Sequence, residues 1–336
     1  MLPLFDRTHS PGSRTATRTE VPSFVPPLSA DLVQLRDRRD WPALYQRVKN
    51  GPQTPEAMYI QAELIRNCTR ATPPARPTAS PAAPTATPSS PPAPPSAEER
   101  RQKFAATIPE NDPFRTQRLA AYDKVSADAC GELSNMGLVR DNAKTLMADA
   151  ASAGYARARA EKLVDDIQRA AQEAAQKDRP DMPRGAFGRM PVTDDQFREL
   201  TELLGSRDAR VLSELRSVLA SSWQDAGLRI GADQQPVDNR AMFAALQLLG
   251  CDLGTPCDAE SQTVLQRCAY QSQCAANTVG DQVYYYDASP HQAQLIERYR
   301  QTLLEMMRSG DFSSLRVVRG PQGAGNTFVF GSGRGP

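Results

Sequence analysis

The chain has few aromatic residues and almost no net charge. Phe, Trp and Tyr make up 6% of its 336 residues, which disfavours a large β-rich core, and 40 basic residues are balanced by 39 acidic ones. A net charge of +1 lacks the strongly positive field that non-specific nucleic-acid binding needs, so we expect no nucleic-acid partner. No apolar run approaches the roughly eighteen residues of a membrane-spanning helix.

Histidine is scarce, and the opening residues show no secretory signal. His9 lies in a Thr-, Ser- and Pro-rich stretch, and His291 follows a Ser-Pro pair typical of a helix start. Neither position indicates a His-activated nucleophile. The residues from Met1 onward lack the basic and apolar regions of a signal peptide. A membrane anchor encoded upstream of Met1 is an alternative that we keep.

Helical periodicity dominates the rest of the chain. Trp41, Leu44 and Val48 recur at spacings of three and four, and Thr54-Pro55 combines a capping hydroxyl with proline at a first helical position. Long alternation is absent, so we expect little β-structure and an all-α fold, either an irregular helical bundle or a short α-solenoid. Further helices are predicted near residues 97–108, 114–122, 140–153, 157–178, 193–204, 208–220, 238–250, 259–272 and 290–309.

Composition divides the chain into segments. Residues 1–28 are predicted to be a flexible arm, residues 29–319 a helical domain and residues 320–336 a flexible Gly-rich tail. Residues 71–97 contain ten prolines, which fix φ and remove amide donors, so this stretch is predicted to be a disordered insert.

One helix junction resembles a repeat motif. Residues 147–160, Met-Ala-Asp-Ala-Ala-Ser-Ala-Gly-Tyr-Ala-Arg-Ala-Arg-Ala, are similar to the helix–Gly–helix turn of Sel1-like or tetratricopeptide repeats. The resemblance implies close antiparallel helices with Gly154 at positive φ. Residues 200–219 have a similar pattern, in which a glycine-containing turn joins two leucine-bearing helices. No fixed period covers the chain, so an ordinary irregular bundle is an equal alternative.

The six cysteines are even in number, as complete pairing into disulfides requires. Zinc sites usually need Cys pairs two to four residues apart, which these gaps do not supply, and buried free thiols are a further alternative. We therefore expect disulfides and no metal or cofactor. A bond between the first two cysteines would place the Pro-rich insert within one domain. The cysteines are Cys68, Cys130, Cys251, Cys257, Cys268 and Cys274.

The pairing within the last four cysteines has two plausible forms. We favour Cys251–Cys268 with Cys257–Cys274, because equal offsets suit two antiparallel segments. Cys268 and Cys274 would stand about 9 Å apart along a continuous helix, too far for a bond. The competing pairing, Cys251–Cys257 with Cys268–Cys274, needs the helix to end between the last two cysteines.

The same four cysteines resemble a module of uncharacterised exported helical proteins of proteobacteria. The similarity lies in Leu-Leu-Gly-Cys-Asp-Leu-Gly-Thr-Pro-Cys and the later Leu-Gln-Arg-Cys-Ala-Tyr-Gln-Ser-Gln-Cys, within a C-terminal module at 238–315. It implies a location and no activity. Disulfides need an oxidising compartment, so we expect a periplasmic or extracellular protein.

No residue set in the sequence forms a catalytic or cofactor motif. The acidic pairs at 165–166 and 194–195 have the placement of solvated helix faces and helix starts. We expect a non-enzymatic, envelope-associated interaction or scaffold protein whose partner is a protein or a cell-envelope component. The alternatives are an envelope hydrolase that uses acidic residues, and a secreted substrate or effector.

Overall fold

The computed structural model describes residues 21–69, 96–178, 190–223, 226–233 and 235–319. These residues form an all-α protein with three disulfides and one short two-stranded ladder, which confirms the predicted fold class. The Gly-rich tail, most of the Pro-rich insert and residues 1–20 of the predicted arm lie outside the described residues.

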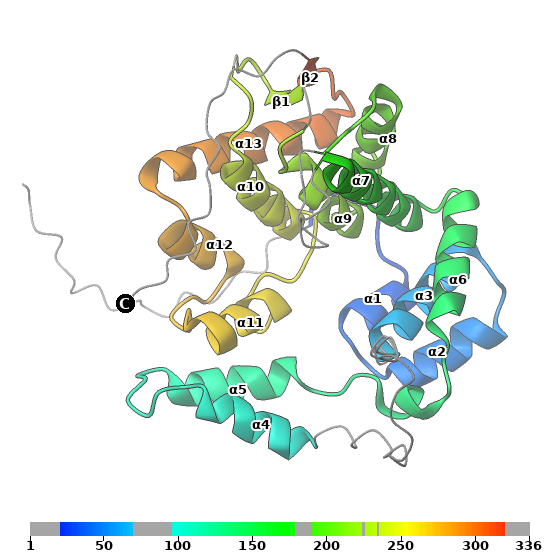
Figure 1. Cartoon of the computed structure of the whole chain (residues 1–336), viewed down its shortest axis with the longest axis vertical. Helices are drawn as coiled ribbons and strands as arrows, with labels where there is room; N and C mark the ends of the chain where they lie inside the picture. The colour runs from blue at the N-terminus through cyan, green and yellow to red at the C-terminus, as the bar shows by residue number, and fades with distance from the viewer. Residues whose placement is uncertain (1–20, 70–95, 179–189, 224–225, 234, 320–336) are drawn as a thin grey trace, which may run out of the picture.

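An N-terminal group of four helices has its own core (Figure 1). Its best-packed contacts join α3 to α6 and α2 to α3. Leu44, Ile60, Leu64 and Ala150 are buried at the centre of this group. The helices are α1 (Ala30–Arg36), α2 (Trp41–Asn50), α3 (Pro55–Cys68) and α6 (Arg140–Ser152).

A larger C-terminal group surrounds a second core. Ile167, Leu203, Leu215, Leu249 and Leu303 are buried there, one from each of five helices. A short helix, α12 (Val279–Gln282), and a π-helical turn at Val283–Asp287 precede the last of them. The five helices are α7 (Ala156–Asp178), α8 (Asp194–Leu204), α9 (Ala209–Leu219), α10 (Asn239–Asp252) and α13 (Pro290–Ser309).

Two helices that lie between α3 and α6 in the chain form a clip that packs on α11 (Figure 1). Phe104 stacks on Tyr122 with ring centroids 4.1 Å apart, and Tyr270 meets both rings edge-on. Arg118 Nε donates to the Ala269 carbonyl at 2.9 Å, so the clip is also hydrogen-bonded to α11. The elements are α4 (Ala97–Ala106) and α5 (Arg115–Val125), which form the clip, and α11 (Gln262–Gln271).

Local sequence explains where the helices begin. Thr54 accepts a hydrogen bond from the Ala57 amide, with Pro55 at the first helical position of α3. At α13, Ser289 and Gln292 form a reciprocal capping box before the 20-residue helix. These caps satisfy amides that lack a partner within the helix.

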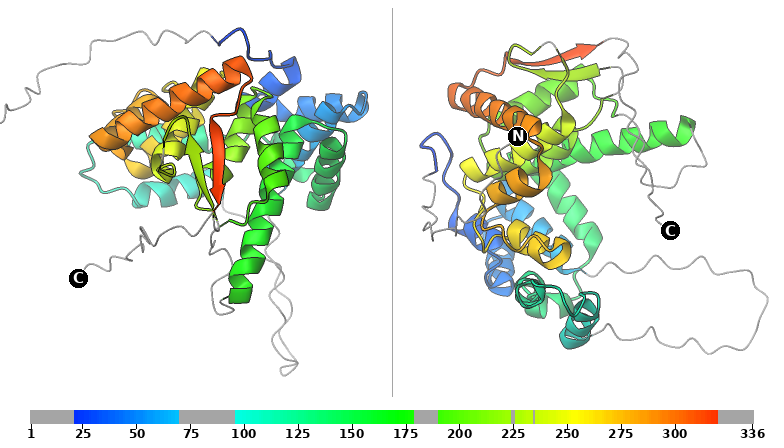
Figure 2. Two further views of the ribbon diagram at one scale, coloured as in Figure 1. Left: turned by 90° about the horizontal axis from the view of Figure 1, so that it is seen from above. Right: turned by 90° about the vertical axis from the view of Figure 1, so that its left-hand side faces the viewer.

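The one described ladder was not predicted. β1 (Ala226–Ile230) pairs antiparallel with β2 (Leu315–Arg319), with Ile230 opposite Leu315. Both strands are five residues long, so neither offers the long alternation that would have indicated a strand. The ladder lies beside α13 at one end of the C-terminal group (Figures 1 and 2).

Gly154 forms the turn between α6 and α7 at φ +86°, as predicted. The Tyr155 amide donates to the Ala150 carbonyl at 3.0 Å and closes the turn. No atom beyond the chain neighbours lies within 4 Å of the position that a Cβ would occupy, so a substitution here changes backbone energy and not packing.

We expect Gly154→Ala to lower the free energy of unfolding by about 1 kcal/mol, because an L-residue in the left-handed region costs about that much. Urea unfolding measures the change. Gly154→Asn is the matched variant, and it should lose less because asparagine tolerates this region. An alanine variant as stable as the parent would contradict the assignment of the turn.

The structure confirms one disulfide and corrects two. Cys68 and Cys130 are bonded, with their Cα atoms 5.4 Å apart. The other bonds are Cys251–Cys257 and Cys268–Cys274. The favoured pairing, Cys251–Cys268 with Cys257–Cys274, was therefore wrong.

Two chain reversals explain the local pairing. Ser272 ends α11 in the left-handed region at φ +59°, so Cys274 turns back on Cys268. Gly254 at φ +94° reverses the chain after α10, which brings Cys257 to Cys251. Each bond therefore closes a loop of only a few residues.

Candidate functional site

The residues that the sequence offered for catalysis do not converge. Asp166 on α7 pairs with Lys162 at 2.5 Å, and Asp195 in the first turn of α8 pairs with Arg198 at 3.0 Å. His291 is exposed in the first turn of α13. His9 lies outside the described residues.

A groove of about 1330 Å³ lies between the N-terminal and C-terminal groups. One side is formed by α1 and the start of α2, including Trp41. The floor comes from α3 and from the starts of α7 and α9, and the far side includes Gln262 and Gln266 of α11. We call this feature the groove.

A buried ionic network forms part of the groove floor. Glu63, 6% exposed, places Oε2 3.1 Å from Arg210 Nη2, and Arg210 Nε donates to Tyr59 Oη at 3.3 Å. The other oxygen of Glu63 lies 3.4 Å from Arg66 Nη2. Burial, with help from Glu63, raises the pKa of Tyr59, so the phenol stays protonated.

Glu161 on α7 extends this network behind the floor. It is 8% exposed and pairs with Arg66. Burial raises the pKa of Glu161 from its ordinary value of 4.5 to about 7; Arg66 opposes the shift, and Glu63 and Glu214 add to it. Two guanidiniums therefore serve three carboxylates, because Arg210 also pairs with Glu214 at 2.9 Å.

The network is short of hydrogen-bond donors. Within the described part of the chain, one oxygen of Glu63 and one of Glu161 are buried without a hydrogen-bond partner. A buried carboxylate oxygen without a donor is costly, which is why protonation of Glu161 is favoured near neutral pH.

A second ion pair closes the floor at the start of α9. Arg157 Nε donates to Asp208 Oδ2 at 2.8 Å. The other oxygen of Asp208 accepts from the amides of Arg210 and Val211, so this carboxylate also caps α9. Asp208 is therefore engaged in holding the helix and the guanidinium in place.

Sequence reasoning did not identify Glu63 or Glu161. The available signal was a single charged residue inside a mostly apolar run: Glu63 lies between Ala62 and Leu64, within a stretch of α3 that is buried from Tyr59 to Ile65. A lone carboxylate in a buried helix segment indicates a buried charge pair.

A non-helical segment of the chain itself borders the groove, with a turn in which the Val25 amide donates to the Pro22 carbonyl at 2.9 Å. Residues 21–28, Val-Pro-Ser-Phe-Val-Pro-Pro-Leu, run between the two groups, and most of them line the groove. Phe24 and Val25 pack against the C-terminal core, and Arg207 lies over the Phe24 ring at 5.7 Å. The part of the predicted arm that the structure describes thus packs on the C-terminal group.

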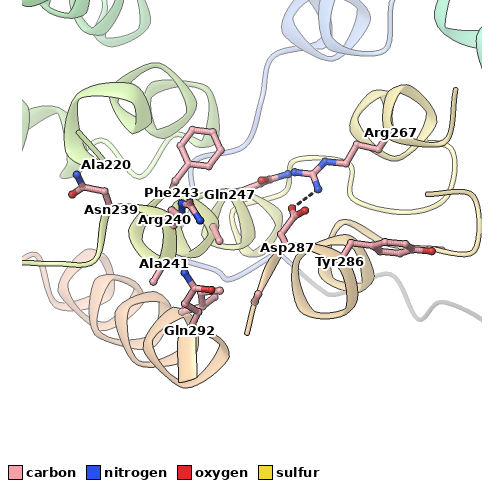
Figure 3. A pocket seen from close by; sticks show the side chains of 13 residues that line it. Ala220, Asn239, Arg240, Ala241, Phe243, Gln247, Arg267, Tyr286, Asp287 and Gln292 are labelled. Carbon is pink, nitrogen blue, oxygen red and sulfur yellow. Dashed lines mark hydrogen bonds and ion pairs between the residues drawn. The ribbon is translucent and has the colours of Figure 1, made fainter. Parts of the chain in front are cut away.

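A smaller pocket of about 580 Å³ lies in the C-terminal group (Figure 3). It is bounded by α10, the π-helical turn and the start of α13, and Arg267 of α11 also lines it. We call it the Phe243 pocket. Its lining residues are Ala220, Asn239, Arg240, Ala241, Phe243, Ala244, Gln247, Arg267, Tyr286, Asp287, Ala288, Gln292 and Ile296.

The described residues hold no group of three or more His, Cys, Asp or Glu side chains arranged for a metal ion. Within the same part of the chain, no helix has the length and apolar character needed to cross a membrane. The three disulfides indicate an oxidising environment outside the cytoplasm. No protein-family model, curated protein or solved structure matches the chain.

Proposed function

We propose that this protein is an interaction or scaffold module of the cell envelope or extracellular space, and that its groove binds a non-helical, proline-containing segment of a partner protein. The observation that carries the proposal is the chain's own non-helical segment at 21–28, most of which already lines the groove. A surface that accommodates one non-helical, proline-containing segment has the shape and chemistry to hold another.

The anchoring contacts explain how such a segment is held. Phe24 packs on the C-terminal core beneath Arg207, and the Val21 side chain approaches Gly254, where a Cβ would lie 3.1 Å from it. Prolines reduce the conformational entropy that an extended ligand loses on binding. A groove between helices can hold such a segment through its apolar side chains, because this mode of binding does not need a ladder of backbone hydrogen bonds.

The charges in the groove favour binding over proton transfer. Glu63 pairs with Arg210, and Asp208 pairs with Arg157 while capping α9. A hydrolase would need a carboxylate free to exchange a proton with a substrate. The hydrolase and the secreted effector remain alternative proposals, and the four-cysteine resemblance supports the compartment common to all three.

A peptide with the sequence of residues 21–28 tests the groove. In Phe24→Asp/Val25→Asp the chain's own segment should leave, because two carboxylates would be buried against apolar side chains. We expect the fluorescently labelled peptide to bind this variant at least about tenfold more tightly than it binds the unaltered chain. Fluorescence anisotropy measures both affinities.

Gln266→Trp is the blocking variant, because Gln266 is exposed on the groove wall. Added to the double variant, it should weaken peptide binding. Gln102→Trp, at an exposed position of α4 outside the groove lining, is the matched control and should leave binding unchanged. The proposal fails if the double variant does not bind the peptide, or if Gln266→Trp binds it equally well.

A further inference from the structure

The Phe243 pocket carries an excess of positive charge. Arg240 and Arg267 line it, and Arg216 on α9 lies beside it with its guanidinium carbon 4.4 Å from the centroid of the Phe243 ring. Among the described residues that line the pocket, Asp287 alone is acidic. Two guanidiniums and one carboxylate therefore line the pocket, and a third guanidinium lies on the ring of Phe243.

Arg216 has no counterion of its own in the described part of the chain. It is half-buried, and burial lowers its pKa, with the charge of Arg267 acting in the same direction. Glu214 acts in the opposite direction, but it pairs with Arg210. Arginine stays protonated in proteins, so Arg216 keeps a partly desolvated positive charge that an anion would stabilise.

Arg240 and Arg267 differ in availability. Arg267 donates to Asp287, as the dashed line in Figure 3 shows, and also to Gln273 at 3.4 Å. Arg240 is exposed and forms no ion pair with the residues that the structure describes. Arg240 is thus the lining charge that is open to a ligand, whereas Asp287 neutralises Arg267 and Arg216 adds its charge from the ring of Phe243.

The rest of the lining combines apolar and uncharged polar side chains. Phe243 is 41% exposed, and Ile296 and four alanines lie among the lining residues, with Asn239 and Gln247. Gln292, in the first turn of α13, also lines the pocket, so the positive end of a 20-residue helix lies near it. A volume of about 580 Å³ is within the range of small-molecule sites.

We propose that the Phe243 pocket binds a carboxylate carried on an aromatic or apolar group. Arg240 holds the carboxylate, because a planar guanidinium matches its two oxygens, and Phe243 packs against the apolar part. Arg216, on the ring of Phe243, adds positive charge beside the site. This site is separate from the groove, since no residue lines both. The same chemistry is found in a free aromatic acid and in the C-terminus of a peptide.

Calorimetric titration with N-acetyl-L-phenylalanine tests the proposal. The unaltered protein should bind this acid at least about tenfold more tightly than it binds N-acetyl-L-phenylalanine amide, which has the same ring and no charge. Arg240→Gln should weaken binding by about tenfold, and Arg216→Gln, which removes a charge outside the pocket lining, should weaken binding less. Asp287→Asn should tighten binding several-fold, because Arg267 is then released from its counterion.

Arg198→Gln is the matched control: this exposed arginine of α8 pairs with Asp195 and lies outside the pocket lining. The Arg198→Gln variant should bind N-acetyl-L-phenylalanine with the same affinity as the unaltered chain. Equal binding of acid and amide, no binding of the acid, or unchanged affinity in Arg240→Gln would overturn the proposal. A tripeptide ending in phenylalanine that binds more tightly than the acetylated amino acid identifies a peptide C-terminus as the ligand, and weaker binding identifies a free acid.

Discussion

Cys68→Ala/Cys130→Ala is expected to lower the free energy of unfolding by about 4 kcal/mol. The bond closes a loop with a sequence separation of 62 residues, and the entropy that a cross-link removes from the unfolded chain grows with the length of that loop. The bond also joins α3 to the segment that leads from the clip into α6. Urea unfolding of both proteins, each followed by circular dichroism, measures the difference.

Cys251→Ala/Cys257→Ala is the matched comparison, because it removes a bond with a sequence separation of six. The same chain-entropy argument gives about 2 kcal/mol for so short a loop. The long-range bond should therefore cost about twice as much to remove as the local one. Equal losses in the two variants would show that loop length does not set the contribution of these disulfides.

Glu161→Gln should change how stability depends on pH. In the folded chain the pKa of Glu161 is about 7, against its ordinary value of 4.5, so the folded state binds a proton that the unfolded state releases between these values. Below pH 4.5 the carboxyl is neutral in both states and the folded state is at its most stable. This stability is lost as the pH rises through about 7, where the buried carboxyl ionises. The loss amounts to about 3 kcal/mol for a shift of this size.

The measurement is the difference in unfolding free energy between Glu161→Gln and the unaltered chain at several pH values. This difference should rise by about 3 kcal/mol in favour of the glutamine variant between about pH 4.5 and pH 8, because glutamine does not ionise. Glu173→Gln, an exposed position on the same helix, should show no such trend. A flat difference for Glu161→Gln would mean that its carboxylate is ionised throughout.

The helices were predictable because their signals are local. The pair Thr54-Pro55 lies at the start of α3, and a polar residue followed by proline at 289–290 lies at the start of α13. Gly154 has the positive φ that its small-residue context indicated. Each of these features depends on a few neighbouring residues, so one sequence is sufficient to recognise it.

The disulfide pairing and the groove depend on information that is not local. Pairing within the four-cysteine module depends on where α11 ends, and the sequence did not show that Ser272 would adopt the left-handed conformation. The contacts of the ionic network at and behind the groove floor join residues far apart in the chain: Arg210 is 147 residues from Glu63, and Glu161 is 95 residues from Arg66. Helical periodicity shows which face of a helix is buried, but not which other helix covers it.

The Cys68–Cys130 bond also determines what limited proteolysis would do to this molecule. The Pro-rich stretch lies inside the loop that the bond closes, since it falls between Cys68 and the start of α4. A protease that cuts one peptide bond there produces two polypeptides that remain covalently joined. On a non-reducing gel the nicked protein would keep the mass of the whole chain, and a reductant would separate an N-terminal fragment carrying α1–α3 from the remainder. Cleavage in this stretch is thus a covalent change that leaves both halves of the groove tethered to each other.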